Sequence, residues 1–239
     1  MPTTNSRVYK SPLFIDSTTV VKAISYQDGK INSDVKVGTY IINENHTLPV
    51  MSVSLNPSSY NKLKSDPWNT ELEYMASAEL YEDNKSFNIP CGFKLFGGST
   101  RGLAKKSFTL KFRKKYGAAS LNYQVFENRD YSKYDSLVLR SGSQDMEYTF
   151  FRDILMTSLV DGVTNLTVQA YKPVILYING EYYGVYNIRE QVDENFISNN
   201  FNVSEDLANI VRIDNDIKAG TAREYFELLE YLSKNSMSN

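Results

Sequence analysis

The sequence predicts an α+β fold: an antiparallel sheet with one main packed helix, preceded by a short β segment. The prediction rests on the order of elements from Leu48 onward, which is antiparallel strands, a loop, a strand, one main helix and a hairpin. Apolar side chains alternate along the strands and recur at helical spacing in the helix. The 239 residues are enough for one to two domains with a buried core.

The frequent β-branched and aromatic residues of 7–42 predict short β-strands in this segment. Short strands are predicted around Val8-Tyr9 and Leu13–Ile15, and longer ones at Thr18–Tyr26 and Val35–Ile42. The stretch is too short for a two-layer core of its own. We therefore expect it to be the tail of a β-sandwich or an arm packed on the rest of the chain.

The next segment predicts a strand, a helix and a hairpin. A strand at Leu48–Ser54 is followed by a helix start at Asn56-Pro57, where a capping side chain precedes proline at the first helical position. Apolar residues at every second position of 72–80 and 87–95 predict two paired antiparallel strands. Another alternating strand covers 108–112.

The second half of the chain predicts two helices around a hairpin. The main helix is expected at Asp145–Val160, where apolar residues lie on one stripe. Strands Val174–Ile178 and Gly184–Ile188 are joined through Asn179-Gly180, a strong hairpin signal. A capping box at Thr221-x-x-Glu224 predicts the start of a C-terminal helix.

Composition excludes several kinds of chemistry. The formal net charge of −2 argues against non-specific nucleic-acid binding. One cysteine, Cys91, excludes an intrachain disulfide and a Cys-rich zinc site, and one histidine, His46, excludes a two-His metal site. No apolar run approaches the roughly 18 residues of a membrane span. We expect carboxylates, Lys, Arg, hydroxyls or a bound ion to carry any chemistry.

The loop between Phe96 and Ser107 is a candidate anion site. Among its three glycines stand Ser99, Thr100, Arg101, Lys105 and Lys106. Glycines allow backbone N–H groups to form an anion nest, and Lys and Arg add charge, so phosphate is the expected guest. The residue order of a Walker A loop is absent, and a mobile basic hairpin loop is the alternative.

Three further positions are weaker candidates. Arg152 lies at the edge of the apolar stripe of the main helix and could reach a neighbouring sheet, or could be solvated. Glu190 ends the second strand of the hairpin and could pair with a buried lysine or cap the following helix. Asp214-x-Asp216 has the spacing of a metal-binding pair, which surface turns also show.

In combination, four stretches resemble the CotH kinase family, the spore-coat-type atypical protein kinases. In chain order they are Thr47–Ser54, Phe96–Phe112, Phe151–Leu155 and Tyr177–Glu190. The second is similar to the family's Gly-Ser-x-x-Arg-x-x-x-Lys-Lys-Ser phosphate loop. The fourth is similar to its Asn-Gly-x-x-x-Gly-x-Tyr hairpin, which ends at a glutamate.

The resemblance implies that residues 44–239 are the N-terminal portion of a kinase domain, with a protein-kinase-like small lobe that binds ATP with Mg²⁺ or Mn²⁺. It implies transfer of the ATP γ-phosphate to Ser or Thr of a coat or cell-surface protein. The implied nucleotide-binding residues are Gly98, Ser99, Arg101, Lys105, Lys106, Ser107, Arg152 and Glu190. Lys106, or its neighbour Lys105, would contact phosphate.

The family's catalytic aspartate and its Trp-Asp-x-Asp-type metal motif have no match in this sequence, since Asp214-x-Asp216 comes too early. We expect both after Asn239, so this chain would hold most of a nucleotide-binding lobe without the phosphoryl-transfer groups.

Residues 7–42 resemble the end of a chitobiase C-terminal-type β-domain, to which we assign residues 1–43. The similar positions are Pro12–Ile15, Thr18–Ala23, Ser33-x-Val35 and Thr39-Tyr40. Such domains often precede CotH modules in surface proteins, which implies a spore coat or a bacterial cell surface. Two alternatives remain: a non-catalytic surface module that binds partners or glycans, and, more weakly, a glycoside-processing enzyme. For the latter no carboxylate pair can be placed across a pocket from sequence.

Overall fold

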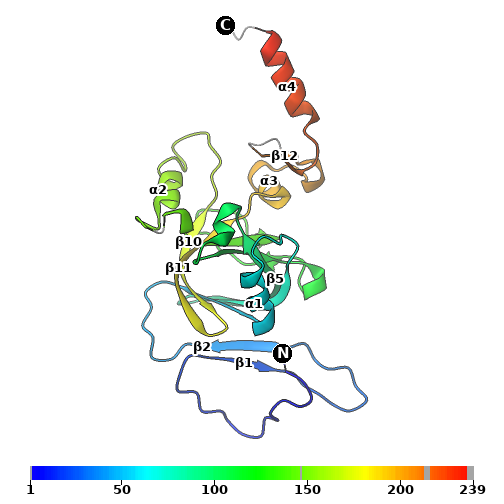
Figure 1. Cartoon of the computed structure of the whole chain (residues 1–239), viewed down its shortest axis with the longest axis vertical. Coiled ribbons are helices and arrows are strands. Elements are labelled where there is room, and N and C mark those ends of the chain that lie inside the picture. Colours follow the sequence, from blue (N-terminus) through cyan, green and yellow to red (C-terminus); the bar gives the residue numbers. More distant parts are fainter. Residues whose placement is uncertain (1, 146, 213–215, 236–239) are drawn as a thin grey trace. The chain divides into compact units, whose positions relative to one another are not determined.

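The structure is a computed structural model that describes residues 2–145, 147–212 and 216–235 (Figure 1). It confirms an α+β fold in which strands outnumber helices among the described elements. The chain divides into two compact units, Met1–Arg189 and Glu190–Asn239. The helices are α1 (Pro57–Ser65), α2 (Arg152–Ser158), α3 (Glu194–Phe201) and α4 (Arg223–Lys234). None of the described helices is long and apolar enough to cross a membrane.

Strands close into a barrel, in the order β10-β11-β9-β6-β5-β4-β3. Their bounds are β3 (Val50–Leu55), β4 (Tyr74–Tyr81), β5 (Ser86–Phe96), β6 (Ser107–Lys111), β9 (Ser136–Arg140), β10 (Tyr171–Ile178) and β11 (Glu181–Glu190). The consecutive strands β3 to β6 pair antiparallel, as do β6 with β9 and β10 with β11. The parallel pair β3–β10, with Val50 opposite Ile175, closes the barrel. This closure was not predicted, because it joins segments more than a hundred residues apart.

Several short elements lie outside the barrel strands. They include the pair β7 (Leu121–Asn122) with β8 (Lys133–Tyr134), and the single-turn 3₁₀ helices η1 (Ser99–Gly102), η2 (Lys114–Tyr116), η3 (Ser143–Asp145) and η4 (Glu205–Leu207).

Alternating apolar side chains fill the barrel, as the sequence predicts. The predicted positions that are buried in the core include Ala76, Ala78, Leu80, Cys91, Phe93, Leu95, Phe108, Leu110 and Phe112. Helix α1 adds Tyr60 and Leu63 to the same core. It begins where predicted, because the Asn56 side chain accepts a hydrogen bond from the Ser58 N–H at 3.0 Å.

The main helix predicted at Asp145–Val160 is wrong in length and in role. Helix α2 covers only Arg152–Ser158, and none of the predicted stripe residues is buried: Ile154 is half-buried and the others are exposed, with Leu159 at 60%. The Asp145 carboxylate accepts the Arg152 backbone N–H at 3.0 Å, which satisfies a first-turn donor and starts the helix there. Phe150 has a φ of +62°, which breaks a helix two residues earlier. The helix packed into the core is α1 instead.

The N-terminal segment forms a separate two-stranded ribbon of β1 (Thr19–Ala23) and β2 (Lys36–Tyr40). The strands predicted around Val8 and Leu13 are wrong, because the chain there is irregular. Both side chains are exposed, so no buried apolar face stabilises a strand at either place. Of the two alternatives for this segment, an arm packed on the rest of the chain agrees with its hydrogen bonds to the barrel, and the tail of a β-sandwich stays a prediction. Whether a domain boundary follows residue 43 stays a prediction.

A buried carboxylate holds the ribbon against the barrel. Glu79 of β4 is 1% exposed, and it accepts hydrogen bonds from the Thr39 hydroxyl, from Tyr81 Oη at 2.9 Å and from Asn88 Nδ2 at 2.9 Å. The Thr39 hydroxyl also meets the Ser52 hydroxyl at 2.8 Å. A buried carboxylate needs such donors, so the ribbon completes the hydrogen bonding of the barrel.

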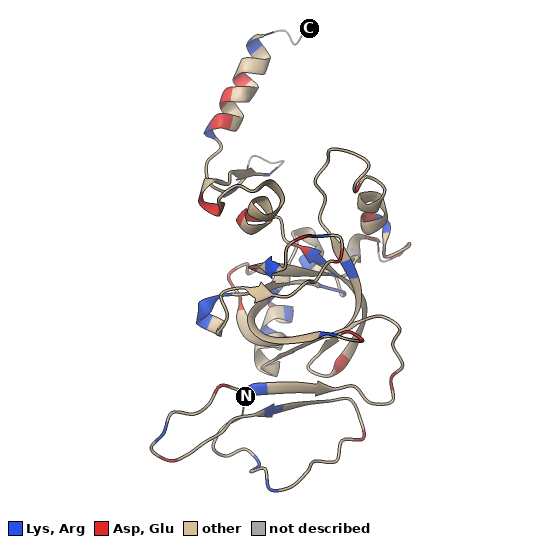
Figure 2. Cartoon of the chain, turned by 180° about the vertical axis from the view of Figure 1, so that it is seen from behind, with Lys and Arg blue, Asp and Glu red and all other residues tan. Residues whose placement is uncertain are grey.

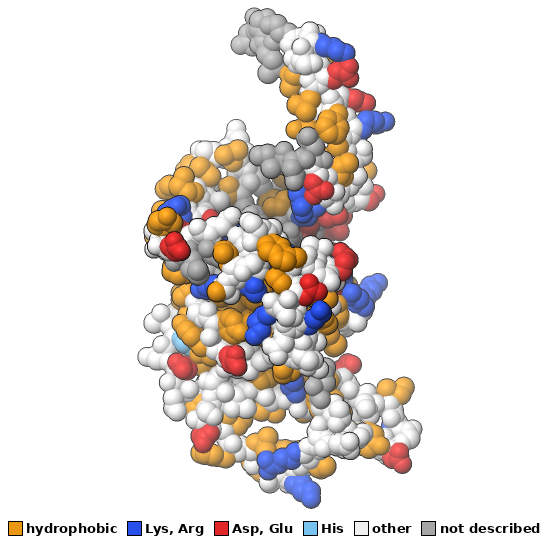
Figure 3. All heavy atoms as spheres, viewed as in Figure 1, with side chains coloured by type: hydrophobic (Ala, Val, Ile, Leu, Met, Phe, Trp, Pro, Cys, Tyr) orange, Lys and Arg blue, Asp and Glu red, His pale blue; other side chains and the backbone are white. Residues whose placement is uncertain are grey.

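The second unit contains α3, α4 and the short pair β12 (Ile210–Val211) with β13 (Ile217–Ala219). Helix α4 confirms the predicted C-terminal helix, but Ala222 is its N-cap and no capping box forms. Acidic residues lie between a basic residue at each end of α4 (Figure 2), and its apolar side chains are exposed (Figure 3). The Asp214-x-Asp216 pair cannot be described as a site, since Asp214 lies outside the described residues.

Candidate functional site

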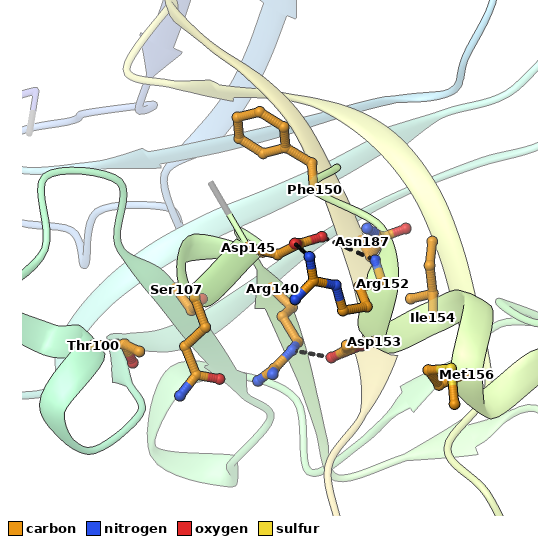
Figure 4. Close-up of a pocket in the computed structure, with 12 residues that line it drawn as sticks. Thr100, Ser107, Arg140, Asp145, Phe150, Arg152, Asp153, Ile154, Met156 and Asn187 are labelled. Carbon is orange, nitrogen blue, oxygen red and sulfur yellow. Dashed lines mark hydrogen bonds and ion pairs between the residues drawn. The ribbon is translucent and has the colours of Figure 1, made fainter. Parts of the chain in front are cut away.

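A cavity of about 300 Å³ lies on the outer face of the barrel beside α2 (Figure 4). Three adjacent strands supply one wall: β6 through Ser107, β9 through Arg140 and β11 through Asn187. Their strand neighbours, which are buried in the core, are Phe108, Leu139, Tyr186 and Ile188. Because successive side chains on a strand point to opposite faces, the polar residues are turned outward into the cavity.

Two arginines and two aspartates line this cavity. Arg152 Nη2 lies 3.3 Å from an Asp145 oxygen, and Arg140 pairs with Asp153 through its Nε (Figure 4). Asp153 also binds Arg189, at 2.7 Å. Arg189 is 3% exposed and does not line the cavity, so the lining carries two guanidinium groups and two carboxylates. The two lining guanidinium groups are donors that can bind an anionic ligand.

Asp145 organises the turn that enters α2. Its carboxylate accepts hydrogen bonds from the Thr149 hydroxyl and from the Arg152 N–H. The Thr149 hydrogen bond is the main reason that the pKa of Asp145 lies below its usual range, and the Arg152 charge adds to it. Asp145 is therefore ionised at neutral pH and holds the Arg152 side chain at the cavity.

Asn187 offers an unused acceptor in this cavity. The residue is 7% exposed, and its Oδ1 has no hydrogen-bond partner among the described residues. A buried amide oxygen without a partner costs free energy, so it is a natural acceptor for a ligand hydroxyl or amino group.

Arg101, predicted at the phosphates, anchors its own loop. Its guanidinium donates to the carbonyl oxygens of Gly97 at 2.7 Å, Leu95 at 2.7 Å and Pro67 at 3.1 Å. The residue is 7% exposed. It thus joins the loop to the end of β5 and to the segment after α1.

The two loop lysines also bind backbone carbonyl groups. Lys106 Nζ donates to Arg101 O at 2.6 Å and to Leu103 O at 3.1 Å. Lys105 Nζ donates to Val185 O at 2.9 Å and lies over two aromatic rings. Burial lowers the pKa of both lysines.

Of the eight residues predicted to bind nucleotide, Ser107 and Arg152 line the cavity. Those not lining it are Gly98, Ser99, Arg101, Lys105, Lys106 and Glu190. From the predicted loop, Thr100 reaches the cavity wall, and Glu190 is a buried residue of the second unit. These positions leave nucleotide binding a prediction for all eight.

Sequence reasoning missed five polar residues of this site: Arg140, Gln144, Asp145, Asp153 and Asn187. A signal existed for two of them, since Asp153 and Asn187 stand inside the stretches that carry the family resemblance. Asn187 is also a polar residue between two apolar strand positions, which indicates an outward face. Nothing local in the sequence indicates that Arg140 and Asp153 meet.

No dedicated cluster of metal-ligating side chains is found among the described residues. No group of three or more His, Cys, Asp or Glu side chains that could hold a metal ion occurs among them. The carboxylates of Asp145 and Asp153 at the cavity are paired with arginines. We therefore assign no metal ligand to this part of the chain.

A family model described as CotH kinase protein matches residues 93–238, more than half of the chain. The chain belongs to the CotH kinase family. A second family model, described as Fn3 associated, matches residues 1–40, the segment that contains the β1–β2 ribbon. No curated protein matches the chain significantly. Both family matches are consistent with a spore-coat or surface protein.

Proposed function

We propose that this chain is the ATP-binding portion of a CotH-type kinase and that the cavity beside α2 receives the phosphate groups of the nucleotide. The carrying observation is that two arginines, Arg140 and Arg152, line one cavity, each held by an aspartate. The barrel with α1 would serve as the protein-kinase-like small lobe. The whole protein would transfer the ATP γ-phosphate to Ser or Thr of a coat or surface protein.

Arg152 is suited to bind phosphate directly. Its side chain is 57% exposed and its ion pair with Asp145 is 3.3 Å long, so the guanidinium can turn to a phosphate oxygen at small cost. Asp153 holds Arg140, which keeps the Arg140 guanidinium at the cavity. Preorganised cations of this kind position a phosphoryl group without further rearrangement.

Ser107 and Asn187 would supply neutral contacts. The Ser107 hydroxyl lies 2.9 Å from the Ser141 hydroxyl, and Ser107 itself lines the cavity. The unpartnered Asn187 Oδ1 can accept a hydrogen bond from a hydroxyl or amino group of the nucleotide.

A non-catalytic coat or surface module is the second candidate, favoured by the contacts of the basic loop. Arg101 binds three backbone carbonyls and Lys106 binds two, so both side chains stabilise the loop itself. A loop with a purely structural role, without any bound nucleotide, would need these same contacts.

ATP binding to the full chain distinguishes the two candidates. With ATP and Mg²⁺ or Mn²⁺ at about 100 times the Kd, binding adds roughly 2.7 kcal/mol to the free energy of unfolding and raises Tm. We expect Arg152→Ala to abolish this rise. Arg113→Ala, which alters an arginine paired with Glu73 away from the cavity, should retain it.

Two results would count against the kinase proposal. If folded wild-type protein shows no Tm rise with ATP and either metal, the non-catalytic module is the better account. If Arg152→Ala keeps the full rise, the nucleotide binds elsewhere and the cavity beside α2 is wrongly assigned.

A further inference from the structure

We propose that a second cavity, of about 480 Å³ between the β1–β2 ribbon and the barrel, binds a neutral polyhydroxylated ligand such as a sugar ring. It shares no lining residue with the cavity beside α2, so the proposal stands apart from ATP binding. Its volume lies in the range of roughly 300–1,000 Å³ that is usual for small-molecule sites.

Two hydrogen-bonding groups in this cavity have unused capacity. Ser54 of β3 is 3% exposed, and its Oγ has no partner among the described residues. Lys22 of β1 donates one hydrogen bond, to Leu55 O at 3.2 Å, and no second one to any residue that the structure describes. Burial lowers the pKa of Lys22, although the nearby Glu79 charge opposes this. An ammonium in this position gains from a further oxygen acceptor.

The charges around the cavity favour a neutral ligand over an anion. Lys22 and Lys36 line it, and Asp34 lines it with the opposite charge. The carboxylate of Glu79 lies close enough to Lys22 to interact with its ammonium. Two cations against two carboxylates leave no net charge to attract an anion.

The available groups match the needs of hydroxyls. A hydroxyl both donates and accepts hydrogen bonds. Lys22 donates, Ser54 can do either, and the Asp34 carboxylate accepts and makes no hydrogen bond to any described residue. A ligand with several hydroxyls on one ring can use all three, whereas a monocarboxylate can use only the donors.

The cavity also has an apolar part suited to the C–H face of a sugar ring. Its apolar lining residues are Val35, Val37, Met75, Ala76 and Pro90. Apolar contact over part of the surface, with a few placed polar groups, is the usual composition of a ligand site.

The test measures binding of glucose, galactose and N-acetylglucosamine to the full chain, by thermal shift and by ligand-observed NMR, with acetate and propionate as anionic comparisons. We expect at least one sugar to raise Tm and to bind at least tenfold more weakly to Ser54→Ala and to Lys22→Met. Ser65→Ala, which removes an exposed hydroxyl of α1 that does not line the cavity, should bind like wild type.

Ser54→Ala also separates a ligand-binding role from a structural one. Since Ser54 Oγ makes no hydrogen bond, removing it should leave the Tm of the free protein unchanged or higher. A lower Tm in the free variant would indicate a structural role and overturn the proposal. It would also be overturned if none of the three sugars binds, if the carboxylates bind in their place, or if Ser54→Ala binds sugar as wild type does.

Discussion

Replacing Arg101 by alanine tests whether this residue serves the loop or a ligand. In the structure its guanidinium donates three hydrogen bonds to backbone carbonyls, and the residue is 7% exposed. Hydrogen bonds from a charged donor contribute roughly 1.5 kcal/mol or more each. Allowing for water that reaches the freed carbonyls when the loop opens, we expect Arg101→Ala to lower the free energy of unfolding by about 3–5 kcal/mol.

Urea denaturation, followed by circular dichroism, measures this loss as a lower midpoint at unchanged slope. Arg101→Lys should recover little, because one ammonium cannot span three carbonyls placed around a planar fork. Arg113→Ala is the matched control: its ion pair with Glu73 leaves Arg113 46% exposed, so its loss should cost less than about 1 kcal/mol. If Arg101→Ala stays within about 0.5 kcal/mol of wild type yet abolishes ATP binding, the structural role is refuted and Arg101 contacts phosphate.

Two further predictions concern buried and partly buried carboxylates. Glu79→Ala removes the acceptor of the Thr39 hydroxyl and one of the two acceptors of Tyr81 and of Asn88. We therefore expect a loss of about 2–4 kcal/mol in the free energy of unfolding and faster proteolysis between β1 and β2. An unchanged cleavage rate there would contradict the role of Glu79 in holding the ribbon. Burial raises the pKa of Glu82, but hydrogen bonds from Lys172 and Tyr123 outweigh it and leave that pKa below its ordinary value. This stabilisation is fully present above the ordinary glutamate pKa of roughly 4.3 and is lost as pH falls through the pKa of Glu82 in the folded protein. Lys172→Met should therefore flatten the fall of the urea midpoint below about pH 5. A dependence of the midpoint on pH identical to that of the wild type would contradict the role of Lys172.

Local patterns carried most of the correct predictions. The alternating strands at 72–80 and 87–95 pair antiparallel as β4 and β5, with their apolar sides in the core. The Asn179-Gly180 turn forms as predicted, with both residues at positive φ (54° and 85°). These features depend on side-chain period and turn chemistry over a few residues, which a sequence displays directly.

The prediction of the main helix shows where local reasoning ends. Apolar spacing over Asp145–Val160 indicated a long helix. In the structure the Asp145 carboxylate accepts the backbone N–H of Arg152, and the helix begins only there, seven residues later. The apolar residues of that stripe have helical spacing, but none of them belongs to the buried core. Periodicity reports which residues could share a face, and it does not report what covers that face.

By itself, the sequence determined the family, the α+β class, the strand faces and the exclusion of His- and Cys-based chemistry, because each depends on residue identity or short spacing. Only the tertiary structure decided barrel closure through β3 and β10, and the partners of the charged residues. Arg101 and Lys106 turned inward to backbone carbonyls, whereas Arg140, Asp153 and Asn187 came together from three separate elements. The physical reason is that a charged side chain goes to the nearest partner in space, and that distance is set by packing across the whole barrel.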